Sequence, residues 1–203
     1  MKTLKNYLCI NGKKTELTEK QLKQLGISIE PIATLTDNGT IAKIGEYEFI
    51  VLKNDGNEIQ LLLKDTLCDK PFDIDCNNFE QSYIRDYLDD FADKLAELVG
   101  EDNIVEHTVD LTADDGLKCY GECDCRVSLL TDQMYRENVY TIDKFKIDKW
   151  WWLATAYSTP KHDCKTWVKS VSPDGYFLSN YYCNFNRGVR PFCILKSNIF
   201  VSK

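Results

Sequence analysis

Apolar and polar residues follow distinct periods along this chain, and the first clear one lies between residues 47 and 64. The segments 47–53 (YEFIVLK) and 58–64 (EIQLLLK) flank the turn cluster Asn54-Asp55-Gly56-Asn57. Apolar-rich segments on either side of an Asp-Gly turn are typical of a β-hairpin. The pattern therefore predicts a hairpin, and we expect it to open the main domain.

A helical period follows over residues 83–99. The apolar positions are spaced three and four residues apart, with an acidic face opposite them, and they are Ile84, Leu88, Phe91, Leu95 and Leu98. Such spacing places one apolar stripe against a core. Ser82 can cap the start of this helix and Gly100 can end it. We predict one main amphipathic helix of about 17 residues, packed on a sheet.

Residues 101–149 carry weaker patterns. The segment 103–112 (NIVEHTVDLT) alternates like a strand, and 113–125 is typical of a loop. Residues 126–138 (RVSLLTDQMYREN) indicate a short strand or the start of a helix, and 139–149 a polar connector.

The last sixty residues predict β-structure. In 150–157 (WWWLATAY), alternation places Trp150 and Trp152 on one face and Trp151 on the other. A strand with apolar side chains on both faces is typical of one that is covered on both sides, so we expect at least two of these rings in the core. Further on, 166–171 and 176–183 predict two strands around a tight turn at 172–175, and 189–195 a final strand that Pro191 starts or interrupts.

The first 36 residues predict a separate small module. Asn11-Gly12 is a hairpin-type turn, Thr18 and Gln21 form a capping box, and Gly26 ends a short helix over 19–25. We therefore expect a module at 1–36 followed by a single α+β domain at 37–203. The start of the chain has too short an apolar run for a secretory signal, and no stretch approaches a membrane span, so we expect synthesis in the cytoplasm and no membrane insertion.

Charge is unevenly distributed. The chain carries −7 with a pI near 4.9, which argues against general nucleic-acid binding. Residues 144–203 carry +7, so the remainder carries −14, and 13 of the 24 aromatic residues lie in this basic segment. Either the two parts complement each other within one fold, or the basic, aromatic segment is a binding face.

Nine cysteines in a chain made in the cytoplasm favour free thiols or metal ligands over disulfides. Cys119, Cys123 and Cys125 form the densest group, with His107 upstream. No second pair with zinc spacing accompanies them, so we expect free, partly exposed thiols in an acidic loop and neither a metal site nor a cofactor. The carboxylate pairs at 89–90 and 114–115 are spaced as solvated faces or turns.

His162 and Cys164 raise the alternative of a nucleophilic enzyme. Neighbouring residues on an extended segment do not automatically meet, and no third orienting group is marked in the sequence.

The segment 184–191 (NFNRGVRP) is the strongest candidate for recognition. Tyrosine, asparagine and arginine supply aromatic area and adaptable hydrogen bonding, which are typical of contact surfaces. We expect Arg190 to be buried in an ion pair with a carboxylate. The candidate ligand-binding residues are Trp167, Tyr181, Tyr182, Asn184, Asn186 and Arg187.

The C-terminal segments "WWWLATAYSTP", "TWVKSVSPDGYFLSNYY" and "NRGVRPFCIL" resemble a family of uncharacterised proteins of Firmicutes and their phages. The resemblance covers roughly residues 40–197, and the W-W-L strand and the G-V-R-P segment carry it. The ending is more distantly similar to C-type-lectin-like domains of the formylglycine-generating-enzyme type, which include variable receptor-binding proteins of retroelements. This implies a C-type-lectin-like fold whose late loops, at 158–165 and 179–187, hold the ligand.

Two departures limit what carries over. Ala154-Thr155 stands where the family has Arg-Ser after W-W-L, and the calcium motifs of sugar-binding lectins are missing. We therefore expect a non-enzymatic protein of phage or mobile-element origin that binds a protein or a glycan, with a virion component as one version. The alternatives are a cytoplasmic regulator of a host protein and an enzyme that uses Cys164 and His162. The oligomeric state is left open.

Overall fold

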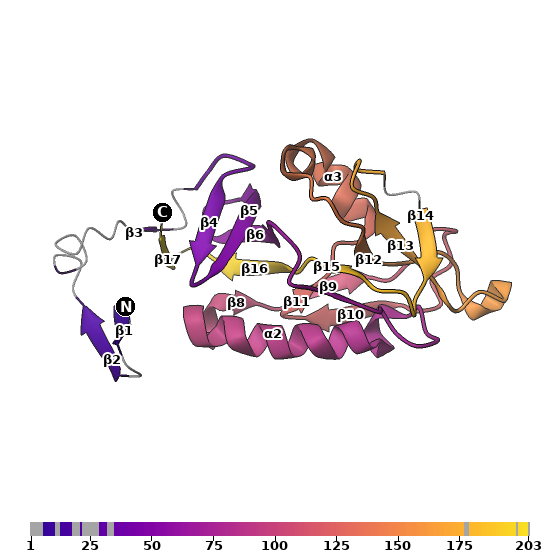
Figure 1. The fold of residues 1–203 in the computed structure, drawn as a ribbon, viewed down its shortest axis with the longest axis horizontal. Helices are drawn as coiled ribbons and strands as arrows, with labels where there is room; N and C mark the ends of the chain where they lie inside the picture. Colours follow the sequence, from indigo (N-terminus) through magenta and orange to yellow (C-terminus); the bar gives the residue numbers. More distant parts are fainter. Residues whose placement is uncertain are drawn as a thin grey trace.

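The computed structural model describes residues 6–10, 13–17, 21, 29–31, 35–176, 179–197 and 199–202. It is a mixed α/β structure, in which nearly all strand pairs are antiparallel, with the two α-helices α2 (Tyr83–Val99) and α3 (Asp132–Ile142). Figure 1 shows α2 along one edge of the molecule and α3 at the opposite edge, with the sheets between them. The α+β class predicted from the sequence is confirmed at this level.

Two sheets form the body of the molecule. The eight-stranded sheet has the order β11 (Val127–Ser128), β16 (Phe192–Lys196), β6 (Glu58–Leu63), β5 (Tyr47–Asn54), β4 (Ile41–Ile44), β17 (Phe200–Ser202) and β3 (Ile29–Pro31), and β8 (Ile104–Val105) also pairs with β16. The five-stranded sheet has the order β14 (Ser179–Tyr182), β13 (Trp167–Val171), β12 (Trp151–Ala156), β15 (Arg187–Val189) and β7 (Cys68–Lys70).

Smaller elements complete the described structure. Two two-stranded sheets pair β1 (Asn6–Ile10) with β2 (Lys13–Leu17) and β9 (His107–Asp110) with β10 (Glu122–Cys125). The short 3-10 helices are η2 (Phe79–Gln81), η3 (Glu101–Asn103), η4 (Asp143–Phe145) and η5 (Pro160–His162).

The hairpin predicted around the Asp-Gly turn is confirmed as β5 and β6. Asp55 closes the turn, because its carboxylate accepts the main-chain N–H groups of Asn57 (2.9 Å) and Glu58 (2.8 Å). Gly56 takes a positive φ of 91° with open space around it, which a glycine adopts without a steric cost.

The main helix is confirmed with its predicted start. The Ser82 hydroxyl accepts the N–H of Arg85 at 3.3 Å, and Gly100 follows the last helical residue. The side chains predicted to face the core are buried except for one: Leu98 is 50% exposed and lies beside Gly45. The last buried position of the helix is Val99 in place of the predicted Leu98.

Residues 113–142 follow the prediction only in part: the short strand β11 and the start of helix α3 lie within 126–138, as predicted, but the neighbouring segments differ. The helix α3 starts at a Thr131 cap and takes in the first four residues of the expected polar connector. Only Tyr135, Thr141 and Ile142 of this helix are buried, which is too sparse a stripe to give a helical period. The expected loop at 113–125 ends in strand β10.

The expected strands of the C-terminal third are present. The strands β13 and β14 flank the turn at 172–175, and β16 begins directly after Pro191. Of the elements predicted in the first 36 residues, the hairpin is confirmed as β1 paired with β2. The Asn11-Gly12 turn, the Thr18 cap and the helix at 19–25, apart from Gln21, lie outside the described residues. The short strand β3 pairs with β17 in the eight-stranded sheet.

The tryptophan strand β12 is buried on both faces, as its pattern predicts. Trp151 and Leu153 pack with Ile50 and Tyr135 in the core layer beneath α3. Trp152 packs in the other core layer, which α2 covers, and its indole N–H donates to the carbonyl of Lys70 at 3.0 Å. Trp151 and Trp152 are 2% and 0% exposed, so two of the three rings are core residues.

Two segments, 58–70 and 187–196, run antiparallel and pass together from one large sheet to the other. The strand β6 pairs with β16 at one end of this ribbon, and β7 pairs with β15 at the other. Between them, Leu63 N–H donates to Pro191 and Leu67 N–H donates to Val189, both at 2.8 Å. Three residues thus lie opposite the single residue Arg190, and the ribbon bulges there.

Arg190 is buried as predicted (1% exposed), but the predicted ion pair is wrong. Its guanidinium donates to the main-chain carbonyls of Leu63 (2.8 Å), Lys64 (2.8 Å) and Phe145 (3.3 Å), and it lies over the Trp151 ring. Burial lowers the pKa of Arg190 to about 10, so the side chain keeps its charge at neutral pH. Main-chain carbonyls at the bulge take the place of the predicted carboxylate partner, because they lie within hydrogen-bond distance of the buried guanidinium.

Candidate functional site

The six candidate ligand-binding residues lie in one region, formed by β13, β14, the turn at 183–186 and the start of β15. Tyr181 and Tyr182 are 36% and 46% exposed, and Phe185 between the strands is 49% exposed. We call this region the aromatic surface; it consists of Trp150, Trp167, Tyr181, Tyr182, Asn184, Phe185, Asn186 and Arg187. Tyr181 and Tyr182 are neighbours on the edge strand β14 and point to opposite faces, so the surface extends round this edge.

Strand register and turn contacts position these rings. Trp167 and Tyr182 are partners across β13 and β14, and their ring centroids are 4.4 Å apart. Tyr181 and Phe185 meet edge to face at 4.9 Å. The turn is anchored through the buried Cys183, whose N–H donates to the carbonyl of Thr166 at 2.7 Å. The exposed rings are therefore carried by a fixed backbone.

The half-buried Arg187 lies among the aromatic rings. Its guanidinium carbon is 4.0 Å from the Tyr181 ring centroid and 4.7 Å from that of Trp150. Asn184 and Asn186 are exposed on the turn beside it. Trp150 was missed as a member of this surface, because it is 37 positions from Arg187 in the chain and the strand pattern does not show which of the three tryptophans lies outside the core.

The three clustered thiols do not form one site. Cys123 and Cys125 are buried on β10, against α2, while Cys119 is exposed in the preceding loop. The expectation of partly exposed loop thiols is thus wrong for two of the three. Burial raises the pKa of Cys125 to about 12, so this thiol stays protonated at neutral pH. Within the described ranges, no group of three His, Cys, Asp or Glu side chains is arranged to hold a metal ion.

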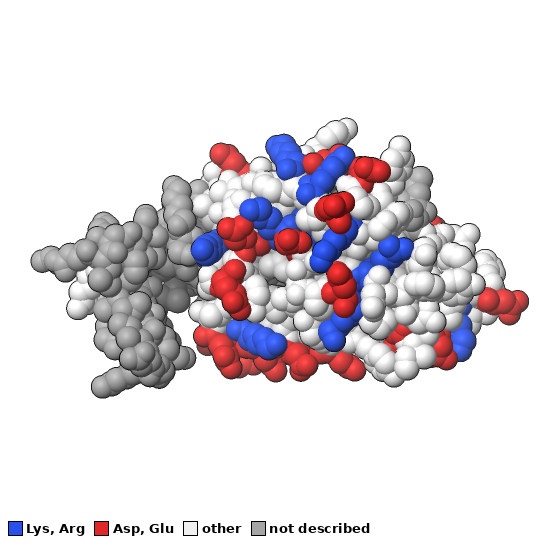
Figure 2. All heavy atoms as spheres, in the orientation of Figure 1, with Lys and Arg blue, Asp and Glu red and all other residues white. Residues whose placement is uncertain are grey.

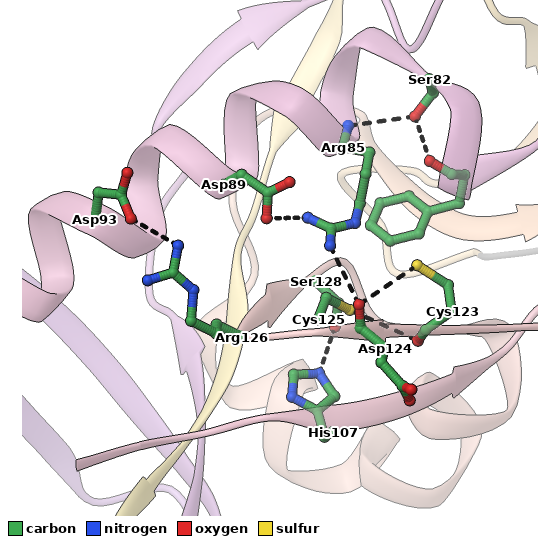
Figure 3. Close-up of polar contacts among 11 residues, drawn as sticks. Ser82, Arg85, Asp89, Asp93, His107, Cys123, Asp124, Cys125, Arg126 and Ser128 are labelled. Atoms are coloured by element: carbon green, nitrogen blue, oxygen red, sulfur yellow. Dashed lines mark hydrogen bonds and ion pairs between the residues drawn. The ribbon is translucent and has the colours of Figure 1, made fainter. Parts of the chain in front are cut away.

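Figure 3 shows the polar network on this side of the molecule. Arg85 pairs with Asp89 one helical turn away and donates to the carbonyl of Asp124 at 3.2 Å, so it joins α2 to β10. His107, which lies upstream of the three thiols in the sequence, contacts the Ser128 hydroxyl through Nε2 at 2.9 Å. Burial lowers the pKa of His107, and this effect is larger than the opposing rise that the main-chain carbonyl of Val105 causes. These contacts are structural links between elements.

The alternative nucleophile pair is not assembled as a catalytic unit. His162 Nδ1 lies 3.0 Å from a carboxylate oxygen of Asp115, which also accepts the Ser158 hydroxyl. Across the described chain, no hydrogen bond joins His162 to Cys164. The half-buried Cys164 is held by its main-chain N–H, which donates to Thr159 at 3.3 Å.

A groove of about 1030 Å³ opens at the bulge of the two-segment ribbon. Its walls come from three distant parts of the chain, 46–48, 63–67 and 144–149, and carry side chains of both charges. Arg190 joins two of these walls, because it donates to both Leu63–Lys64 and Phe145. Sequence patterns contain no signal for this groove, since it exists only where the three segments meet.

Within the described residues, the helices are too short or too polar to cross a bilayer. Searches of curated proteins and of solved structures returned no match. The family model described as "Domain of unknown function (DUF6273)" matches residues 57–197, which is most of the chain and takes in both the tryptophan strand and the G-V-R-P segment. The chain therefore belongs to the DUF6273 family.

Proposed function

We propose that this chain is a non-enzymatic binding protein that recognises a protein or a glycan through the aromatic surface. The observation that carries the proposal is the exposure of Tyr181, Tyr182 and Phe185 on a turn whose backbone is fixed by strand pairing. Aromatic side chains in such a position offer contact area at a low entropic cost, because they have few rotatable bonds and need little ordering on binding.

Alanine variants of this surface test the proposal. Tyr182→Ala and the double variant Asn184→Ala/Asn186→Ala should weaken ligand binding by about tenfold or more, because exposed tyrosines at contact centres dominate binding energy. Binding of the labelled chain is measured on arrays of bacterial glycans and of purified bacterial surface proteins.

Tyr140→Ala is the matched control, since Tyr140 is 88% exposed on α3, outside the aromatic surface. All variants should melt at the wild-type temperature, because the substituted side chains are exposed. Wild-type binding by the Tyr182 and asparagine variants would contradict the assignment of the site.

We further propose that the fold is related to C-type-lectin-like domains and that the protein is of phage or mobile-element origin, with a virion component as one version. The resemblance of the W-W-L and G-V-R-P segments supports this kinship. An experimental structure that superimposes on such a domain tests the first part. Tail genes or a reverse transcriptase beside the coding sequence would support the second, and early regulatory genes would oppose it.

A second candidate is a regulator that binds a basic host protein, and the charge of α2 favours it. The exposed face of this helix carries Asp86, Asp90, Asp93 and Glu97. Figure 2 shows acidic side chains gathered along the edge where α2 lies in Figure 1. Binding of a basic protein through this face should weaken steeply with added salt, because the carboxylates are exposed to solvent and their charges are screened.

A further inference from the structure

Arg187 differs from every other arginine of the chain in its partners. The sequence contains five arginines, and the structure describes them all. Arg85, Arg126 and Arg136 each pair with an aspartate, and Arg190 donates to three main-chain carbonyls. Arg187 makes neither a hydrogen bond nor an ion pair with any described residue, and its Nε is buried without a partner.

The rings around Arg187 hold it in place without neutralising it. Trp150 and Tyr181 both lie within cation–π distance of its guanidinium carbon. An aromatic face stabilises a cation but does not use its N–H donors, which lie in the plane of the guanidinium. The N–H groups of the two Nη atoms, which are not buried as Nε is, thus remain available for an oxyanion, which such a planar donor pair can bind in a bidentate manner.

The surroundings of Arg187 favour a negative ligand. Burial lowers the pKa of Arg187, and Tyr181 is the group whose charge acts against this; no carboxylate of the described chain contributes. On the neighbouring strand β7, the residue paired with Arg187 is Lys70. The Lys70 ammonium lies over the Tyr87 ring and forms no ion pair with a described residue. Arg187 and Lys70 are therefore paired positions at this edge of the sheet, and neither forms an ion pair with a described residue.

We propose that Arg187 binds an acidic group of a glycan, so that the ligand of the aromatic surface is a sugar bearing a carboxylate or a sulfate ester. This inference rests on the proposed function and names its ligand class. The geometry of the surface fits a sugar: the C–H faces of a sugar ring stack on aromatic rings such as Tyr181 and Phe185. The amides of Asn184 and Asn186 can both donate to and accept from hydroxyl groups.

The size of the surface also favours a glycan over a protein. A stable protein interface buries on the order of 800 Å² on each partner. The exposed part of the aromatic surface is a few rings and two amides, carried by β14 and the turn at 183–186, and it is closer in size to one or two sugar residues than to such an interface.

The test follows the arginine Nε–Hε signals of the full-length chain by NMR during titration with three probes: glucuronate, glucose 6-sulfate and glucose. Five signals are expected, and Arg187→Lys assigns the one of interest. The Arg187 signal should shift saturably with glucuronate or with glucose 6-sulfate, which separates the carboxylate from the sulfate ester, and should stay in place with glucose.

Arg187→Lys should weaken binding of the acidic sugar by about tenfold or more, because an ammonium loses the bidentate geometry. Arg136→Gln is the control, since Arg136 lies on α3 and pairs with Asp132. The titration of the wild-type chain is a test that does not depend on whether a variant folds. An Arg187 signal that neither acidic sugar moves would overturn the inference.

The array experiment keeps this failure apart from failure of the proposed function. If neutral glycans bind the wild type, lose affinity for Tyr182→Ala and keep full affinity for Arg187→Lys, only the inference of an acidic ligand is refuted. If no ligand on the arrays binds in a manner that depends on Tyr182, both the proposed function and the acidic ligand are refuted.

Discussion

At the residue scale, the G-V-R-P segment explains how the two large sheets are joined. Val189 and Pro191 accept hydrogen bonds from the facing segment, and Arg190 fills the bulge with a charged group that three carbonyls surround. A buried charge persists only where such partners satisfy it. Each residue of the segment thus has a structural role in the ribbon that carries Arg187 at its end.

Gly188 has a steric role that a substitution can test. A Cβ at this position would overlap Cγ2 of Thr66 and approach the carbonyl oxygen of Trp150 to 3.2 Å. We expect Gly188→Ala to lower the free energy of unfolding by about 1–3 kcal/mol, measured by chemical denaturation, because the ribbon is closely packed there.

The second variant, Thr66→Ser, removes the overlapping methyl group. The double variant Gly188→Ala/Thr66→Ser should therefore recover part of the loss, and the recovery is obtained from a double-mutant cycle. Additive effects of the two substitutions would show that Thr66 is not the obstacle.

At the scale of single elements, α2 illustrates how local signals and packing agree. Its cap, its length and most of its apolar stripe follow from neighbouring residues in the sequence, and the same stripe covers one layer of the core. The helix α3 has a good Thr131 cap but buries little, so its position depends on Tyr135 packing against Trp151.

The Ser82 cap should make a measurable contribution to α2. Its hydroxyl accepts the Arg85 N–H and donates to the Phe79 carbonyl, and the residue is buried. We expect Ser82→Ala to lower the free energy of unfolding by about 1 kcal/mol, and Ser82→Asp, which can also cap, to lose less. Equal losses for both variants in urea denaturation would indicate that burial, and not capping, decides the effect.

At the scale of the whole molecule, His107 joins the β9–β10 pair to the eight-stranded sheet. Its ring meets Phe192 of β16 edge to face at 5.2 Å, and its Nε2 contacts Ser128 of β11. Burial lowers the pKa of His107 below the ordinary value of 6.5. The unfolded chain therefore binds a proton at a higher pH than the folded chain does.

The sign of the pH dependence follows. Above pH 6.5, His107 is neutral in both states; as the pH falls below 6.5, protonation favours the unfolded chain. The free energy of unfolding should fall by up to about 1.4 kcal/mol per pH unit until the folded pKa is reached.

Denaturation curves between pH 7 and pH 5.5 measure this effect. His107→Gln should reduce the slope in this window. An unchanged slope in His107→Gln would assign the pH dependence to other groups.

The amino-acid sequence alone determined the elements whose burial is local: the hairpin around Asp55-Gly56, the helix after Ser82 and the tryptophan strand with two covered faces. Each of them leaves a period in adjacent residues, because burial repeats with the geometry of the element. The sequence also indicated the candidate residues between Trp167 and Arg187, which lie close together in the chain.

Only the tertiary structure decided the contacts between distant segments. It placed Trp150 against Arg187, gave Arg190 carbonyl partners from two walls of the groove, and separated Cys119 from the buried Cys123 and Cys125. Such contacts depend on which strands become neighbours, and that choice is made by the packing of the whole chain, so no short stretch of sequence records it.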